Sequence, residues 1–92
     1  MSSALNLLEL AHAALKFAHA LSEVDRCKRA LSDGYAAWRN ATGYREHVAK
    51  GSPEWIAMMA ATDGEYRALE RAKARERRAR TALRAAAREV EQ

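Results

Sequence analysis

The chain has 92 residues, a net charge of +4, one proline, four glycines and one cysteine. This length allows one domain at most, and abundant Ala, Leu, Arg and Glu beside scarce Val, Ile and Thr predicts an all-α fold. Cys27 has no partner for an internal disulfide, no signal-peptide pattern is found, and no apolar stretch approaches the roughly 20 residues that span a bilayer. We therefore expect a cytoplasmic protein that does not enter a membrane.

The first predicted helix covers residues 3–42. With Leu7 as heptad position a, nine of ten core positions are apolar or aromatic. Positions a are Leu7, Ala14, Leu21, Lys28 and Tyr35, and positions d are Leu10, Phe17, Val24, Leu31 and Trp38. Ser2 or Ser3 can cap the start, and the segment that ends at Gly43 can terminate the helix. Gly34 lies off this seam, so the helix is expected to continue through it.

A turn over about 43–52 precedes a second predicted helix over about 53–91. Ser52 is a good N-cap, Pro53 a good first helical residue, and Glu54 complements the helix dipole. Asp63-Gly64 is a possible break in this helix. Its seam keeps the same 3–4 spacing over Trp55, Met58, Thr62, Glu65, Leu69, Ala72, Glu76, Ala79, Leu83, Ala86 and Val90.

Two long helices joined by a short turn predict an antiparallel, coiled-coil-like hairpin. Leu7, Leu10, Ala14, Phe17 and Leu21 would then face the C-terminal part of the second helix. The alternative is a compact bundle of helices near 3–31, 35–49, 53–62 and 65–91. We favour the hairpin.

The first helix also carries apolar residues outside its expected seam, including Leu5, Leu8 and Leu15. A helix that is apolar on more than one face requires more than one neighbour. These leucines predict a homodimer, built as a four-helix arrangement, or obligate docking on a partner.

Positive charge is concentrated at the C-terminal end. Residues 1–70 hold eight cations and nine acids, a net charge of −1, whereas residues 71–92 hold eight cations and three acids, a net charge of +5. The cations are Arg71, Lys73, Arg75, Arg77, Arg78, Arg80, Arg84 and Arg88. They predict an anionic partner, either an acidic protein surface or nucleic acid. A solvated outer face would have the same composition.

Aromatic and methionine residues gather around the predicted turn. The candidate partner-binding residues are Tyr35, Trp38, Arg39, Tyr44, Arg45, Trp55, Met58, Met59 and Tyr66. Tyr, Trp and Arg are enriched at binding hot spots, and methionine adapts to irregular surfaces. The alternative is a small core that seals the helix ends.

Chemistry-bearing patterns are scarce. Glu9 and His12 have the E-x-x-H spacing of di-iron bundles, but a second copy is missing, and Cys27 has no C-x-x-C partner. We therefore expect no metal, no cofactor and no enzymatic activity.

Short, basic helical chains without catalytic motifs are common among bacterial and phage accessory proteins. We expect a non-catalytic protein-binding module of this kind, which inhibits or adapts a host machine by occluding its surface. The alternatives are a nucleic-acid-binding accessory protein that uses the Arg-rich helix and a structural assembly subunit.

Overall fold

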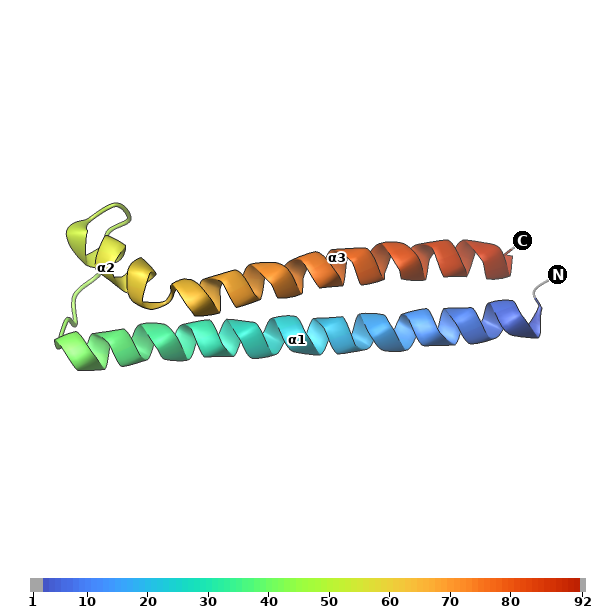
Figure 1. The fold of residues 1–92 in the computed structure, drawn as a ribbon, viewed down its shortest axis with the longest axis horizontal. Coiled ribbons are helices and arrows are strands. Elements are labelled where there is room, and N and C mark those ends of the chain that lie inside the picture. The colour runs from blue at the N-terminus through green and yellow to red at the C-terminus, as the bar shows by residue number, and fades with distance from the viewer. Residues whose placement is uncertain (1–2, 92) are drawn as a thin grey trace.

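The computed structural model describes residues 3–91 and consists of three helices in that range, α1 (Ala4–Thr42), α2 (Pro53–Ala61) and α3 (Asp63–Glu91) (Figure 1). The long helices α1 and α3 lie side by side in opposite directions, and α2 lies at the turn. The molecule measures 62 × 20 × 18 Å. This elongated hairpin-like shape confirms the predicted all-α hairpin and excludes the compact bundle.

The helix ends follow the capping residues in the sequence. The Ser3 hydroxyl accepts a hydrogen bond from the Asn6 amide (3.0 Å) and caps α1; the other candidate, Ser2, lies outside the described residues. Gly43 ends α1 in the left-handed conformation, with φ of 74°. The Ser52 hydroxyl accepts from the Trp55 amide (3.1 Å) and caps α2, which begins at Pro53.

The second predicted helix is divided at Thr62. The Thr62 backbone (φ −111°, ψ 15°) lies between α2 and α3, and its hydroxyl donates to the Met58 carbonyl at 2.8 Å. Local bonding of this kind competes with regular helix geometry. The break therefore falls one residue before the predicted Asp63-Gly64 site.

The face that α1 presents to α3 differs from the predicted one. The predicted d residues Leu10, Phe17, Val24, Leu31 and Trp38 are buried or half-buried. The other half of the seam consists of the residues one place before the predicted a positions, namely Asn6, Ala13, Ala20, Cys27 and Gly34.

The predicted a positions lie mostly outside the α1–α3 contact. Leu7 is 52 % exposed, Leu21 is 43 % exposed, and Ala14 is also exposed, so the prediction that these three pack on α3 was wrong. Lys28 is exposed, whereas Tyr35 is partly buried and packs against the core. The two candidate sets share the d positions and differ only in which flank completes the seam, so the 3–4 spacing alone could not separate them.

The observed seam combines small and large residues. On α3 the described seam is the predicted one from Glu65 through Val90, and the core centres on Val24, Leu31, Leu69 and Ala72. Small side chains on both helices let the backbones approach closely. Ala72, which is fully buried, has a side chain small enough to allow such a close approach.

No helix within residues 3–91 combines the length and apolar character needed to cross a membrane.

Candidate protein-binding surfaces

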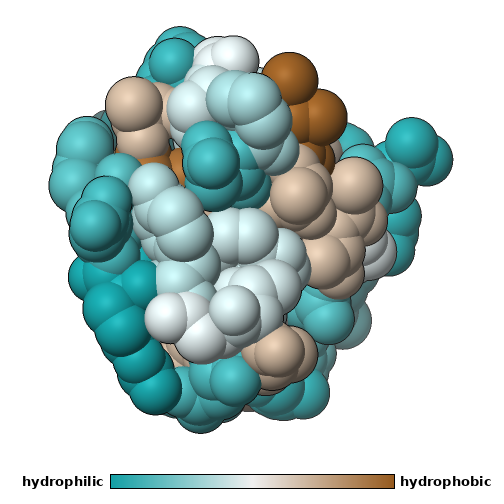
Figure 2. All heavy atoms as spheres, turned by 90° about the vertical axis from the view of Figure 1, so that its left-hand side faces the viewer, coloured by the Kyte–Doolittle hydropathy of each residue, from teal (hydrophilic) through white to brown (hydrophobic). Residues whose placement is uncertain are grey.

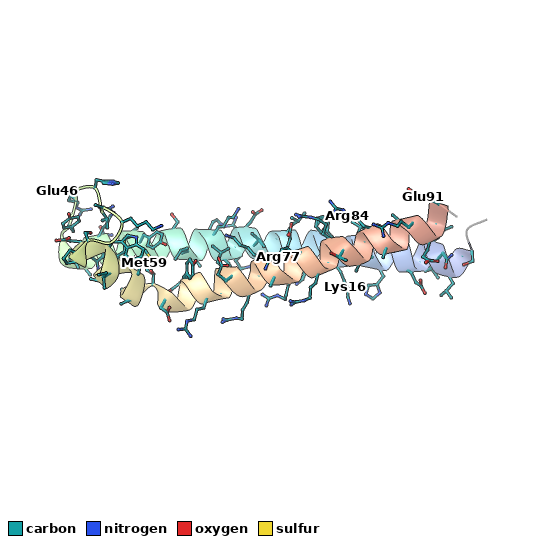
Figure 3. The ribbon with its side chains drawn as sticks, turned by 90° about the horizontal axis from the view of Figure 1, so that it is seen from above. Lys16, Glu46, Met59, Arg77, Arg84 and Glu91 are labelled. Carbon is teal, nitrogen blue, oxygen red and sulfur yellow. The ribbon has the colours of Figure 1, made fainter. Side chains whose placement is uncertain are left out.

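The cations of α3 divide into two rows along the helix. Residues three or four apart lie on one face of a helix. The first basic row consists of Lys73, Arg77, Arg80, Arg84 and Arg88, and the second basic row consists of Arg71, Arg75 and Arg78. The rows flank α3 on the two sides of its seam. Arg84 of the first row and Lys16 of α1 lie toward opposite edges of the hairpin (Figure 3).

Few of these cations have an acidic partner. Lys73 lies 3.7 Å from the Glu70 carboxylate, and Arg80 pairs with Glu76. Within residues 3–91, no carboxylate pairs with the remaining six, which are Arg71, Arg75, Arg77, Arg78, Arg84 and Arg88. A helix that carries so many unpaired cations presents a positive field over several turns.

Arg80 has a structural role within the hairpin. Its guanidinium carbon lies 5.7 Å from the centroid of the Phe17 ring, and its guanidinium also pairs with the Glu76 carboxylate. The Glu76 side chain is only 12 % exposed. Arg80 therefore neutralises an acid on the seam and covers an aromatic ring, so its guanidinium is already engaged within the hairpin.

The second basic row continues onto α1. A hollow of about 310 Å³ lies between the helices and is lined by Lys16, Arg75, Arg78, Ala79 and Ala82. Three cations thus surround a floor of alanines. The sequence prediction missed Lys16, because its contribution depends on the antiparallel alignment that brings it beside residues about 60 places later.

Part of the aromatic group at the turn holds the fold together. Tyr35 packs on the core, Met58 is buried, and the Trp38 and Tyr44 rings lie 5.9 Å apart. Arg39 donates from Nη1 to the Glu46 carbonyl at 2.9 Å. These residues fasten the segment after α1 onto the end of that helix.

Arg45, another candidate of this group, is exposed and donates to the Asn40 side-chain oxygen at 3.3 Å. It bridges the end of α1 and the following segment rather than joining the aromatic side chains.

The rest of the aromatic group faces solvent. Trp55, Met59 and Tyr66 line a depression of about 450 Å³ together with Lys50 and Asp63, and we call this depression the turn-end pocket. Ile56, on the exposed side of α2, adds apolar surface nearby. Seen from the turn end, the surface is largely hydrophilic, with apolar patches at the upper right and the upper left (Figure 2).

The turn-end pocket and the first basic row share a flank of α3. Tyr66 precedes Lys73 by seven residues, and residues seven apart on a helix face the same way within about 20°. The row therefore runs from the pocket toward the C-terminal end. The second basic row begins on the other flank, away from the pocket.

The leucines predicted as oligomer contacts are among the most exposed apolar residues. Leu5, Leu8 and Leu15 are 64 %, 67 % and 73 % exposed. Leu8 and Leu15 border a depression of about 540 Å³ along α1 with Ala11, His12, Lys16 and His19. This surface is separate from the turn-end pocket, which lies at the other end of the hairpin.

No group of three or more His, Cys, Asp or Glu side chains within residues 3–91 is arranged to hold a metal ion. Comparisons with protein-family models, with curated proteins and with solved structures found no match.

Proposed function

We propose that this chain is a non-catalytic protein-binding module that docks on an acidic surface of another protein. The observation that carries the proposal is the alignment of the turn-end pocket with the first basic row on one flank of α3. An apolar anchor beside a row of unpaired arginines fits a partner that offers an apolar side chain next to acidic residues.

Each part of this flank has a distinct role in the proposal. Arg77, Arg84 and Arg88 attract and orient the acidic partner, and their planar guanidinium groups suit bidentate pairing with carboxylates. Trp55, Met59 and Tyr66 provide contacts that exclude water and slow dissociation. An elongated hairpin of this kind would act by covering its partner's surface. This is how a bacterial or phage accessory protein inhibits or adapts a host machine.

Nucleic-acid binding is the second candidate, and the six unpaired arginines of α3 favour it. Such binding would rest on phosphate contacts, whose affinity falls steeply with salt. It would leave Trp55, Met59 and Tyr66 without a role, because phosphate contacts do not require an exposed apolar pocket 450 Å³ in size. For this reason we favour the acidic protein.

The two candidates are separated by one set of binding measurements. The tagged chain is used to recover partners from a bacterial lysate, with and without nuclease treatment, and is titrated in parallel with generic duplex DNA over a range of salt concentrations. A protein partner that survives nuclease treatment supports the proposal. Tight DNA binding with a steep salt dependence, unaffected by Trp55→Ala, would support the nucleic-acid alternative instead.

A further inference from the structure

The N-terminal half of α1 has a second apolar face that the hairpin leaves uncovered. The residues on this face are Ala4, Leu8, Ala11, Leu15, Ala18 and Ser22, and all six are exposed. They recur at 3–4 spacing, as in a coiled-coil seam. At 100° per residue, their mean direction is about 160° from that of the α3-facing residues Asn6 to Ala20. The two seams of α1 therefore lie on nearly opposite sides of one helix.

This outer seam has definite ends. The same spacing continues beyond Ser22 to Asp25, Arg29 and Ser32, which are charged or polar and exposed. The apolar part thus covers residues 4–18, a length of about 21 Å at 1.5 Å per residue. A continuous apolar face of this kind marks an interaction site on a protein surface.

We propose that the outer seam of α1 binds a second copy of this chain, with the two α1 helices antiparallel about a two-fold axis near Ala13. In this register Leu8 faces Ala18 of the other copy, and Ala11 faces Leu15. The four inner layers then each combine one large and one small residue, so the helices interdigitate there, whereas the two outer layers pair Ala4 with Ser22. A parallel pair would place leucine on leucine and alanine on alanine, alternating crowded and empty layers.

The flanking residues agree with the antiparallel register. Leu7 of one copy lies at about the level of Leu21 of the other, and both leucines are exposed outside the α1–α3 contact.

Charge also argues for a second copy rather than an acidic partner at this face. Apart from its two histidines, residues 4–22 carry only Glu9 and Lys16, a net charge of zero, whereas the excess positive charge lies on α3. A neutral, self-complementary face neither repels its own copy nor attracts a strongly acidic partner. The dimer would leave the turn-end pocket and both basic rows uncovered, so this inference does not depend on the proposed function.

The first experiment measures self-association of the full chain by sedimentation velocity over a concentration series. We expect a monomer–dimer equilibrium. Ala18→Leu should raise the dimer dissociation constant at least about tenfold, because it places leucine against Leu8. The double variant Leu8→Ala with Ala18→Leu exchanges the sizes within that layer and should return the constant to within a few-fold of the original. Circular dichroism checks that each variant keeps its helices.

The second experiment fixes the orientation by crosslinking in a Cys27→Ser background with a short bismaleimide. His12→Cys should crosslink between copies, because residue 12 lies near the two-fold axis. Ser22→Cys is the matched control: antiparallel copies place these positions about 27 Å apart along the axis, whereas parallel copies place them face to face. A monomer at all concentrations, failure of the size exchange to restore association, or crosslinking through residue 22 alone would each overturn the proposal.

Discussion

Gly34 lies directly against Thr62: a Cβ atom at Gly34 would come within 3.2 Å of the Thr62 Cγ2 atom. Gly34 faces α3 within α1, and Thr62 is the buried residue that separates α2 from α3. Because Gly34 has no side chain, the break between α2 and α3 can lie directly against α1. This contact limits which residues can replace Gly34, and helix propensity alone does not predict that limit.

Gly34→Ala should change the free energy of unfolding by less than about 0.5 kcal/mol, although alanine is favoured over glycine in a helix by roughly 1 kcal/mol. The tight contact with Thr62 offsets the gain. In a Thr62→Ser background, which removes Cγ2 and keeps the hydroxyl that bonds to Met58, the same substitution should stabilise by about 0.5–1 kcal/mol.

Gly64→Ala serves as the control for this pair, because nothing lies within 4 Å of a Cβ at that helical position. Its effect should be the same in both backgrounds. Urea unfolding measures all of these values, and equal effects of Gly34→Ala in the two backgrounds would show that the contact with Thr62 carries no energy.

The α1 seam gives a second prediction, which corrects the expectation from sequence that both Phe17 and Leu21 face the second helix. Leu31→Ala should cost about 2–5 kcal/mol and Phe17→Ala about 2–4 kcal/mol, since Leu31 is buried and Phe17 is half-buried under Arg80. Leu21→Ala should cost less than about 1 kcal/mol. The measurement is urea unfolding at low protein concentration, where self-association does not contribute. A loss at Leu21 as large as that at Leu31 would place Leu21 in the core.

The sequence was sufficient to predict the all-α class, the hairpin, most helix ends and the α3 seam, because capping residues and 3–4 spacing are local signals. It was not sufficient to choose the α1 seam. The prediction placed Leu7 and Leu21 on the seam, where the structure has Asn6 and Ala20. The choice depends on how α1 packs against α3: at Gly34, for example, a Cβ atom would lie 3.2 Å from the Thr62 Cγ2 atom.

The candidate binding surfaces, like the α1 seam, could be predicted only where they depend on residues close together in the sequence. Residue type predicted that Trp, Tyr and Met would gather at the turn, but only the fold separates Met58, which is buried, from Met59, which lines the turn-end pocket. The approach of Lys16 to Arg75 and Arg78 likewise depends on the pairing of two helices. Residues distant in sequence become neighbours through packing, which a pattern along one helix does not encode.

Glu76 gives a third prediction, because it is an acid on the seam with a single basic partner. Glu76→Ala should destabilise the hairpin by about 1 kcal/mol, since it leaves Arg80 without its pair; the partial exposure of Arg80 keeps the cost small. Glu76→Leu should be neutral or stabilising, because a well-packed apolar residue replaces a half-buried ion pair. Urea unfolding of both variants checks this, and a larger loss for leucine than for alanine would contradict it.

The last prediction separates the two basic rows by a matched pair of charge reversals. Arg77 and Arg84 belong to the first basic row and Arg75 and Arg78 to the second, and all four are unpaired among residues 3–91. Each double substitution to glutamate changes the net charge by the same amount. Arg80 is left unchanged, because its substitution would break the pair with Glu76 and mix an effect on stability with the effect on binding.

If the acidic partner docks on the flank that carries the turn-end pocket, Arg77→Glu with Arg84→Glu should slow its association at least about tenfold, whereas Arg75→Glu with Arg78→Glu should have a much smaller effect. Trp55→Ala should instead speed dissociation, because it removes an apolar anchor. Association and dissociation rates against the recovered protein partner measure all three. Equal slowing by both reversals would indicate attraction by the overall field of α3, and slowing by the second pair alone would move the docking site to the hollow beside Lys16.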